Sequence, residues 1–326
     1  MTTTPPHIIS ATDFRAIPAA VDALRAGGLV AMPTETVYGL AADAGNAKAV
    51  GAIFLAKGRP RFNPLIIHVA SVRLAREIGV FTPEAERLAE VFWPGPLTLV
   101  LPRRQNAPVA DLALAGLTTV AIRVPAHPVA RALLVAFAGP LAAPSANRSG
   151  HVSATTAAHV AADLGDAVAV ILDAGATPIG LESTIVGFEG GCPTLLRSGG
   201  INRIAIEAVL GAPLAVPTVD PTAPHAPGML ASHYAPAAAL RLNAISVAPG
   251  EGLLAFGSTV LTGASNAIAA VNLSKSGDLA EAAAGFFAAL RNLDVKAKVI
   301  AVAPIPEEGL GEAINDRLRR AAAPRD

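Results

Sequence analysis

The sequence predicts an α/β protein with two domains separated by a proline-rich linker. Along most of the chain, short apolar segments of strand length alternate with segments of helical period, as is typical of α/β and α+β domains. A chain of 326 residues is long enough for two domains that each bury a core. Between Pro213 and Pro236, six prolines interrupt any regular period, which favours an extended linker. We therefore expect domains at 1–211 and 238–326 and a linker at 212–237.

The individual elements follow in chain order from these periods. In the first domain we expect strands near Leu29–Met32, Leu65–Val69, Leu97–Leu101, Thr119–Val124, Val168–Leu172, Ile185–Phe188 and Thr194–Arg197. We expect helices there at Ala47–Ala56, Pro83–Phe92, His127–Phe137, Ala154–Leu164 and Arg203–Leu210. In the second domain we expect strands near Leu240–Leu242, Leu253–Phe256, Ile268–Asn272 and Val299–Val302, and helices at Asp278–Leu293 and Leu310–Ala321. Thr82 and Ser153 supply helix start signals.

Charge and cysteine content restrict the class of protein. The 25 basic and 25 acidic side chains balance, which argues against binding nucleic acid or membrane by bulk electrostatics. Cys192 is the single cysteine, so an internal disulfide and a multi-cysteine metal site are excluded and a reducing compartment is favoured. The N-terminus has no signal-peptide pattern, and no apolar run of about 18 residues occurs. We expect a cytoplasmic protein without a membrane segment.

Several familiar catalytic and nucleotide motifs are missing. The sequence contains no GxxxxGK[ST], HExxH or GxSxG, and GLGEAI at 309–314 lacks the third glycine of a dinucleotide motif. The histidines and the cysteine show no zinc-ligand spacing. We therefore expect no protein-held metal.

The stretch from Pro33 to Val69 concentrates polar side chains in an otherwise apolar chain. PTETVYGL supplies hydroxyl groups, and KGRPRFNPLIIHV supplies three cations, an amide and a histidine. Such a cluster of cations and hydrogen-bonding groups predicts an anionic ligand.

Two short motifs make the prediction specific. Lys57-Gly58-Arg59 and Ser145-Ala146-Asn147 match the KxR and SxN signature of the YrdC-type domain, and PGMLASHYAP matches the linker of the two-domain L-threonylcarbamoyladenylate synthases. The chain resembles that family over almost its whole length. The resemblance implies a YrdC-type twisted open sheet around a concave, positively lined cavity, followed by a small Rossmann-like α/β domain.

The resemblance also implies an activity. Enzymes of this family condense L-threonine, bicarbonate and ATP into L-threonylcarbamoyl-AMP and release pyrophosphate, as the first step of tRNA threonylcarbamoyladenosine modification. Mg²⁺ is expected through the ATP phosphates, with no tightly bound organic cofactor. The expected partners are the three substrates, a downstream tRNA threonylcarbamoyl-transfer system and a weak tRNA contact.

The resemblance assigns an ATP side of the cavity to Lys57, Arg59, Asn63, Thr119, Ser145, Asn147, Arg197 and Tyr234. Lys57 and Arg59 would bind the triphosphate and act as the catalytic residues. Several of these residues have an alternative, purely structural role. Lys57 and Arg59 would then complement the dipole of a helix, and Asn63 and Thr119 would belong to a turn or a strand surface. Ser145 and Asn147 would form a capped turn, and Tyr234 would anchor the linker to the core.

The resemblance assigns the L-threonine side to Thr36, His68, Arg123 and Ser183. The arginine is the natural partner of a carboxylate, since a buried guanidinium without an anion is costly. The alternative for His68 is a hydrogen-bonded core residue. Tyr38 either lines the site or fills the core, and Glu35 has no assigned role.

Two other classes of function stay open. One is an RNA-binding module, for which RNA affinity would depend steeply on salt. The other is a carbamoyltransferase of the hydrogenase-maturation type, which would carry acylphosphatase-like and cysteine-rich segments that this chain lacks. For the second domain we expect a lid or regulatory platform, with the linker folded over the bound nucleotide.

Overall fold

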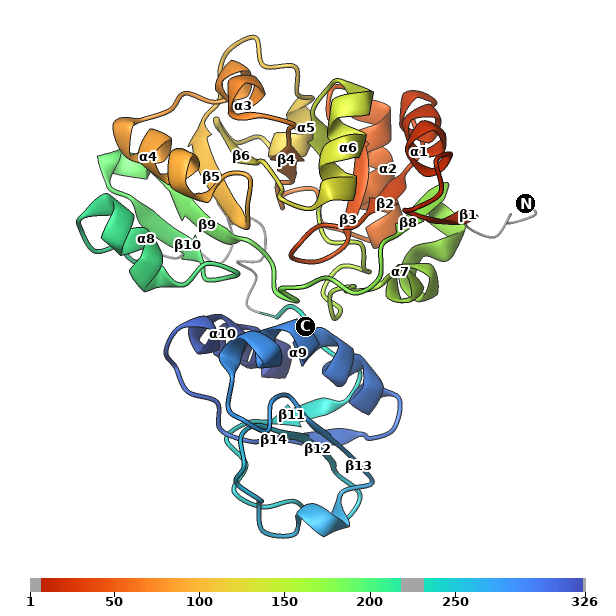
Figure 1. Ribbon diagram of the computed structural model, residues 1–326, viewed down its shortest axis with the longest axis vertical. Coiled ribbons are helices and arrows are strands. Elements are labelled where there is room, and N and C mark those ends of the chain that lie inside the picture. Colours follow the sequence, from red (N-terminus) through yellow and green to blue (C-terminus); the bar gives the residue numbers. More distant parts are fainter. Residues whose placement is uncertain (1–6, 218–231, 325–326) are drawn as a thin grey trace.

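A ten-stranded mixed sheet forms the centre of the larger domain (Figure 1). The computed structural model describes residues 7–217 and 232–324, so most of the expected linker lies outside the described residues. The strands, in their order across the sheet, are β1 (His7–Ser10), β8 (Val170–Asp173), β2 (Val30–Met32), β3 (Gly39–Asp43), β7 (Leu141–Ala142), β4 (Ile66–His68), β6 (Thr119–Arg123), β5 (Leu97–Pro102), β9 (Thr184–Gly187) and β10 (Thr194–Arg197).

The register of four neighbouring strands determines where the polar side chains meet. β4 and β6 are parallel and pair His68 with Arg123 at their carboxyl ends. β5 is antiparallel to β6 and parallel to β9. The starts of β5 and β9 therefore lie at the same sheet edge as the ends of β4 and β6. This edge collects side chains from four distant parts of the sequence.

Helices cover this sheet, and several are delimited by their own polar caps. They are α1 (Ala16–Arg25), α2 (Ala47–Lys57), α3 (Val72–Ile78), α4 (Pro83–Phe92), α5 (Asp111–Leu114), α6 (Pro128–Phe137), α7 (Ala157–Leu164) and α8 (Arg203–Leu210), with short 3₁₀ turns η1 (Gly165–Ala167) and η2 (Glu189–Gly191). Asn46 accepts two backbone N–H groups at the start of α2, and Gly58 ends it in the left-handed conformation at φ 58°, as is common at helix C-termini. None of the helices in the described parts of the chain is long and apolar enough to span a membrane.

Two expected helix starts have different outcomes. Thr82 accepts the Ala85 N–H at the start of α4, which confirms that signal. The start at Ser153 is wrong. Thr156 caps α7 instead, because the Ser153 hydroxyl is buried and donates to Glu182 at 2.5 Å.

The smaller domain has a parallel four-stranded sheet with two helices on the side facing the larger domain (Figure 1). Its strands, in spatial order, are β11 (Ala239–Arg241), β14 (Val299–Val302), β12 (Gly252–Ala255) and β13 (Ala269–Asn272), and its helices are α9 (Leu279–Asp294), α10 (Leu310–Ala322) and the 3₁₀ turn η3 (Ala264–Asn266). Its apolar core includes Phe286 and Leu290 from α9 and continues to Val37, Val152 and Leu181 of the larger domain.

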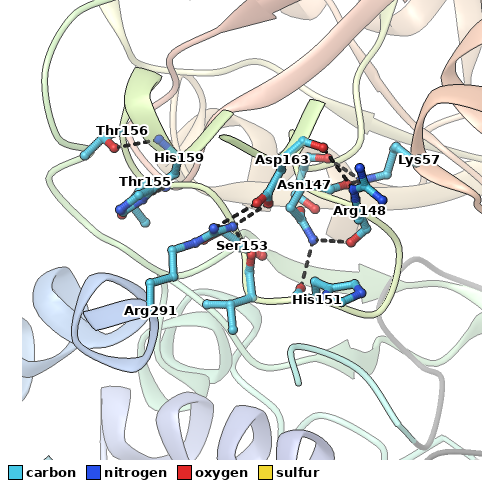
Figure 2. Close-up of polar contacts among 12 residues, drawn as sticks. Lys57, Asn147, Arg148, His151, Ser153, Thr155, Thr156, His159, Asp163 and Arg291 are labelled. Carbon is cyan, nitrogen blue, oxygen red and sulfur yellow. Dashed lines mark hydrogen bonds and ion pairs between the residues drawn. The ribbon is translucent and has the colours of Figure 1, made fainter. Parts of the chain in front are cut away.

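The two domains also touch through backbone and ion pairs. A Cβ at Gly180, whose φ is +73°, would lie 2.3 Å from the Ala283 carbonyl oxygen, so a residue without a side chain permits this approach. Arg291 on α9 forms a two-pronged ion pair with Asp163 on α7 (Figure 2). Docking of the second domain therefore rests on close packing as well as on charge.

Candidate active site

A cavity with about 530 Å³ of space not filled by protein atoms opens at the sheet edge where β4 and β6 end. Its wall combines cationic, hydroxyl and imidazole groups with a few apolar side chains. The lining residues are Thr34, Thr36, Val37, Tyr38, Gly39, Arg59, Ile66, His68, Arg123, Ala143, Pro144, Ser145, Glu182, Ser183, Arg197, His233 and Tyr234.

Arg123 dominates one side of this cavity. Its Nε donates to the Gly95 carbonyl at 3.2 Å, Nη1 to the Thr36 hydroxyl at 2.9 Å and Nη2 to Glu35 at 2.6 Å. A guanidinium has more N–H groups than these three bonds use. Arg123 is thus held in place by protein acceptors and still has donors for a carboxylate ligand.

Glu35 is the counter-ion that stabilises the buried arginine. Its second carboxylate oxygen accepts the backbone N–H groups of Ala126 and His127 at 3.1 and 3.2 Å. Burial acts to raise the pKa of Glu35, but the Arg123 charge and these hydrogen bonds outweigh it and lower the pKa. Glu35 therefore orients Arg123 as a carboxylate, a role that no sequence motif indicated.

The imidazole of His68 lies beside this ion pair. Burial, together with the nearby Arg123 charge, lowers the pKa of His68 to about 3. Its Nδ1 lies 3.3 Å from the Ile66 carbonyl oxygen. At neutral pH the ring is uncharged, so it presents a hydrogen-bonding group without adding a second positive charge.

Two further buried arginines, Arg59 and Arg197, line the cavity. Arg59 donates to the Asn63 side chain at 2.7 Å and to the Pro64 carbonyl at 2.8 Å. Arg197 donates to the carbonyl and hydroxyl oxygens of Ser183 at 2.9 and 3.1 Å. Burial lowers the pKa of Arg59 to about 10 and lowers that of Arg197. Both arginines would gain stability from an anionic ligand, because their charges are poorly solvated.

Lys57 lies behind the lining of the cavity. It donates to the Ser145 carbonyl oxygen at 2.5 Å and also to the Asn147 carbonyl oxygen. Burial, followed by repulsion from Arg59, lowers the pKa of Lys57 well below its ordinary value. In Figure 2 the Asn147 side chain in turn donates to the carbonyls of Arg148 and His151, both at 2.8 Å. The KxR and SxN motifs are therefore joined directly, by lysine bonds to the SxN backbone.

Four buried side-chain atoms in or beside the cavity have no hydrogen-bond partner within residues 7–217 and 232–324. They are Asn63 Nδ2, Asn147 Oδ1, His233 Nδ1 and the Tyr234 hydroxyl. Native proteins leave few such groups unsatisfied. Their concentration at one place is typical of a site that binds a polar ligand.

The predicted site residues fall into three groups. Those that line the cavity are Thr36, Arg59, His68, Arg123, Ser145, Ser183, Arg197 and Tyr234. Lys57 and Asn63 lie behind the lining and bond to its residues Ser145 and Arg59, and Asn147 bonds in turn to Lys57. Thr119 pairs with Pro102 at the other end of β6, about 13 Å along the strand from Arg123 at the usual rise per residue. Its assignment to ATP binding stays a prediction without a contact to the cavity.

Three lining or supporting residues were missed from the sequence. Glu182 and His233 line the cavity, and Arg317 of the second domain bonds to Glu182. For Arg317, the sequence does contain a pattern that indicates a buried charge. It falls on the same helical face as Ile314 and Leu318, and a charged residue on an apolar face requires a buried partner.

No group of three or more histidine, cysteine, aspartate or glutamate side chains within the described ranges is arranged to hold a metal ion. The two acids nearest the ligand space are already engaged, Glu35 with Arg123 and Glu182 with Arg317.

A cavity lined by three buried arginines at the ends of the strands of an α/β sheet is typical of a protein that binds anionic ligands. The profile of the Sua5/YciO/YrdC family, described as telomere recombination, matches residues 22–199, and the profile of the threonylcarbamoyl-AMP synthase C-terminal domain matches residues 201–323. The chain belongs to this family, in its two-domain form, and is a nucleotidyltransferase-type enzyme.

Individual relatives agree with this assignment over most of the chain. The threonylcarbamoyl-AMP synthase of Bacillus subtilis (strain 168) is 42% identical over 320 residues, which cover 93% of this chain and 91% of that protein. The corresponding protein of Pyrococcus abyssi is 43% identical, with 92% of each chain covered. The crystal structure of P. abyssi Sua5 complexed with L-threonine is similar with a TM-score of 0.87 and 38% identity, and the match covers 98% of each chain.

Proposed function

We propose that this protein makes L-threonylcarbamoyl-AMP from L-threonine, bicarbonate and ATP, with release of pyrophosphate. The observation that carries the proposal is one cavity lined by three buried arginines that fall into two groups, Arg123 with Glu35 and His68, and Arg59 with Arg197 near Tyr234. Arg123, with Thr36 and His68 beside it, suits an amino-acid carboxylate and hydroxyl, whereas Arg59 and Arg197 suit phosphate oxygens. Family membership favours this activity over an RNA-binding module and over a carbamoyltransferase.

The residues present can support the reaction by binding and charge stabilisation. The amine of L-threonine and bicarbonate first form a carbamate with loss of water. A carbamate oxygen then attacks the α-phosphorus of ATP, and pyrophosphate leaves. Because two anions must approach each other, catalysis requires cations and orientation more than a covalent nucleophile. We assign orientation to Arg123 and Ser183, and charge stabilisation to Arg59, Arg197 and Lys57.

Mg²⁺ would enter with the triphosphate and neutralise part of its charge. The proposal needs no carboxylate for the metal, in agreement with the engagement of Glu35 and Glu182 by arginines. The unpartnered Asn147 Oδ1 is an oxygen that could coordinate Mg²⁺ or accept a hydrogen bond from a water bound to it.

The product is a reactive mixed anhydride, so we infer that a separate transfer system consumes it at a tRNA adenosine. Until then the adenylate must be kept from water. His233 and Tyr234, at the described end of the linker, line the cavity and suit a cover over the nucleotide.

Pyrophosphate release by the purified protein tests the proposal. We expect release from ATP only when both L-threonine and bicarbonate are present, together with a product of the mass of threonylcarbamoyl-AMP. L-Serine should be a much poorer substrate because it lacks the methyl contact. Equal rates without bicarbonate would replace the proposal by ordinary amino-acid activation.

A further inference from the structure

Arg317 belongs to the smaller domain, but its guanidinium lies against the cavity wall of the larger one. The side chain has no exposed surface. Its Nε donates to Glu182 Oε2 at 2.9 Å, and its Nη2 donates to the Ser198 carbonyl oxygen at 2.8 Å. Since Glu182 lines the cavity, a single side chain connects α10 with the site.

The same guanidinium also contacts the tyrosine of the linker. The Arg317 Cζ lies 4.9 Å from the ring centroid of Tyr234, within the range of a cation–π contact. Tyr234 lines the cavity and has a φ of 62°. This conformation is unfavourable for a bulky residue, so it persists only where the surroundings hold it.

Backbone bonds hold the linker on both sides of this tyrosine. The His233 N–H donates to the Arg320 carbonyl on α10 at 3.2 Å, and the Ala235 N–H donates to the Gly150 carbonyl at 2.8 Å. The ring itself is fixed by Arg317 and by Phe287 of α9, whose ring centroid lies 5.8 Å away. The ring thus rests on side chains of the smaller domain while it faces the cavity of the larger one.

Arg317 has an electrostatic effect as well. Glu182 is a buried carboxylate that accepts from Arg317 and from Ser153. Without the arginine, an unpaired negative charge would face the cavity side that also contains Arg197. Such a charge would repel a triphosphate and compete with it for the arginine.

We propose that Arg317 is a positioning residue for the nucleotide side of the cavity. It neutralises Glu182 and holds Tyr234 in place, so that docking of the smaller domain completes the ATP site. The inference rests on the proposed function, because it takes the occupant of that side to be ATP. Arg317 touches no substrate and acts through the two side chains of the wall.

A double-mutant cycle between Arg317→Met and Tyr234→Ala tests this role. We expect Arg317→Met to raise the KM and the Kd for ATP about tenfold and to change the KM for L-threonine less than about twofold. In the Tyr234→Ala background, the same substitution should add a clearly smaller effect, about threefold, because the contact with Tyr234 is already gone and only the pairing with Glu182 is lost. Pyrophosphate release gives the KM values, and calorimetry gives the Kd for ATP.

Arg203→Met is the matched control. Arg203 on α8 forms another ion pair between the domains, with Glu312 on α10 at 2.8 Å, and neither residue lines the cavity. This control should leave the KM for ATP unchanged. Equal effects of the two methionine variants, or independent effects of Arg317→Met and Tyr234→Ala, would overturn the inference.

Folding is controlled separately. If thermal unfolding shows that Arg317→Met is not folded, the cycle uses the pair Glu182→Gln with Arg317→Met, which removes both buried charges together. In this pair no Glu182 charge is left to neutralise, so only the loss of support for Tyr234 should raise the KM for ATP, by a few-fold, and this rise should vanish in the Tyr234→Ala background. A rise that persists there would overturn the inference. Failure of the proposed function would already be visible in the wild-type protein as a missing product, whereas failure of this inference would be visible only in the variants.

Discussion

At the scale of single residues, Arg123 is prepared for a carboxylate before any ligand binds. Its bonds to Gly95, Thr36 and Glu35 fix the plane of the guanidinium, so little side-chain entropy remains to be lost on binding. We expect Arg123→Lys to weaken L-threonine binding by about 1.5–3 kcal/mol, roughly ten- to a hundredfold, because an ammonium cannot form the same fork. Calorimetry with L-threonine measures the change.

Lysine is the informative substitution here because it keeps a cation beside the buried Glu35. Alanine would leave that carboxylate unpaired, and lost stability would be confused with lost affinity. Arg131→Lys, at an exposed position on α6, serves as the control and should bind L-threonine like the wild-type protein. An unchanged affinity in Arg123→Lys would remove the arginine from the threonine side of the cavity.

The lowered pKa of His68 leads to a prediction of how the free energy of unfolding depends on pH. Its pKa is about 3 in the folded protein against an ordinary value of 6.5, so between these values the unfolded chain binds a proton that the folded protein does not. The stability that His68 contributes is therefore full above about pH 6.5 and falls as the pH is lowered. In His68→Gln the slope of unfolding free energy against pH should be smaller by up to about 1.4 kcal/mol per pH unit in this window.

Urea unfolding at a series of pH values from 4 to 7, without substrates, measures these slopes. The comparison is between two proteins that share every other titrating group. Parallel curves for the wild-type protein and His68→Gln would show that the pKa of His68 is not lowered by folding. The imidazole would then not be the desolvated group beside Arg123 that we assign to the threonine site.

At the scale of elements, the end of α2 directs the KxR motif into the site. Gly58 takes the left-handed conformation with nothing within 4 Å of an added Cβ, so Gly58→Ala would suffer backbone strain alone, about 1 kcal/mol. Because the turn aims Arg59 at the cavity, we expect this variant to raise the KM for ATP several-fold. Gly211 ends α8 in the same conformation, also with open space around it.

Gly211→Ala is therefore the matched control for the same backbone change away from the site. The two variants should lose similar unfolding free energy, as measured by urea denaturation, but only Gly58→Ala should change ATP kinetics. If both variants kept the wild-type KM, the α2 terminus would be a structural cap without influence on the nucleotide side.

Much of the fold was predictable from periodicity, and the exceptions have local causes. The strands from β4 to β6 and the helices α2 and α4 agree with the expected segments. The sequence predicted no helix at α1, where Pro18 interrupts the pattern and Arg15 provides no side-chain cap. The short strand β3 begins inside the PTETVYGL segment, at Gly39, so the polar motif hid its strand pattern.

Site residues were predictable where they belong to a family motif. They were less predictable where a side chain supports another residue of the site from a distant part of the chain. Arg59 and Arg123 could be assigned from the sequence because their motifs are specific, and both line the cavity. Thr119 and Arg123 share one strand, so the strand prediction already separated them along the sheet. Glu182 and Arg317 depend on a contact across 135 residues of chain, which no local pattern records.

At the scale of the whole molecule, the two domains share a core and a wall of the cavity. The apolar cluster of the smaller domain includes Tyr234 and three side chains of the larger domain. The larger domain nevertheless has its own core, which extends to Leu214, and Ala215 pairs with Thr194 beside β10. We therefore propose to place the boundary of the catalytic domain a few residues after the expected position at 211.

A chain that ends at Pro217 tests what the rest of the protein adds. We expect residues 1–217 to fold, because the main core is complete, but to bind ATP at least tenfold more weakly, because Arg317 no longer neutralises Glu182 and Tyr234 is absent. L-Threonine binding should change less, since Arg123, Glu35 and Thr36 all remain.

Family members with the first domain alone indicate that the chemistry itself does not require the second domain, so some product should still form. Calorimetry with each ligand, pyrophosphate release and the lifetime of the adenylate in the reaction mixture separate these effects. Equal ATP affinity and equal adenylate lifetime in the short and full chains would show that the second domain contributes neither to ATP binding nor to protection of the adenylate.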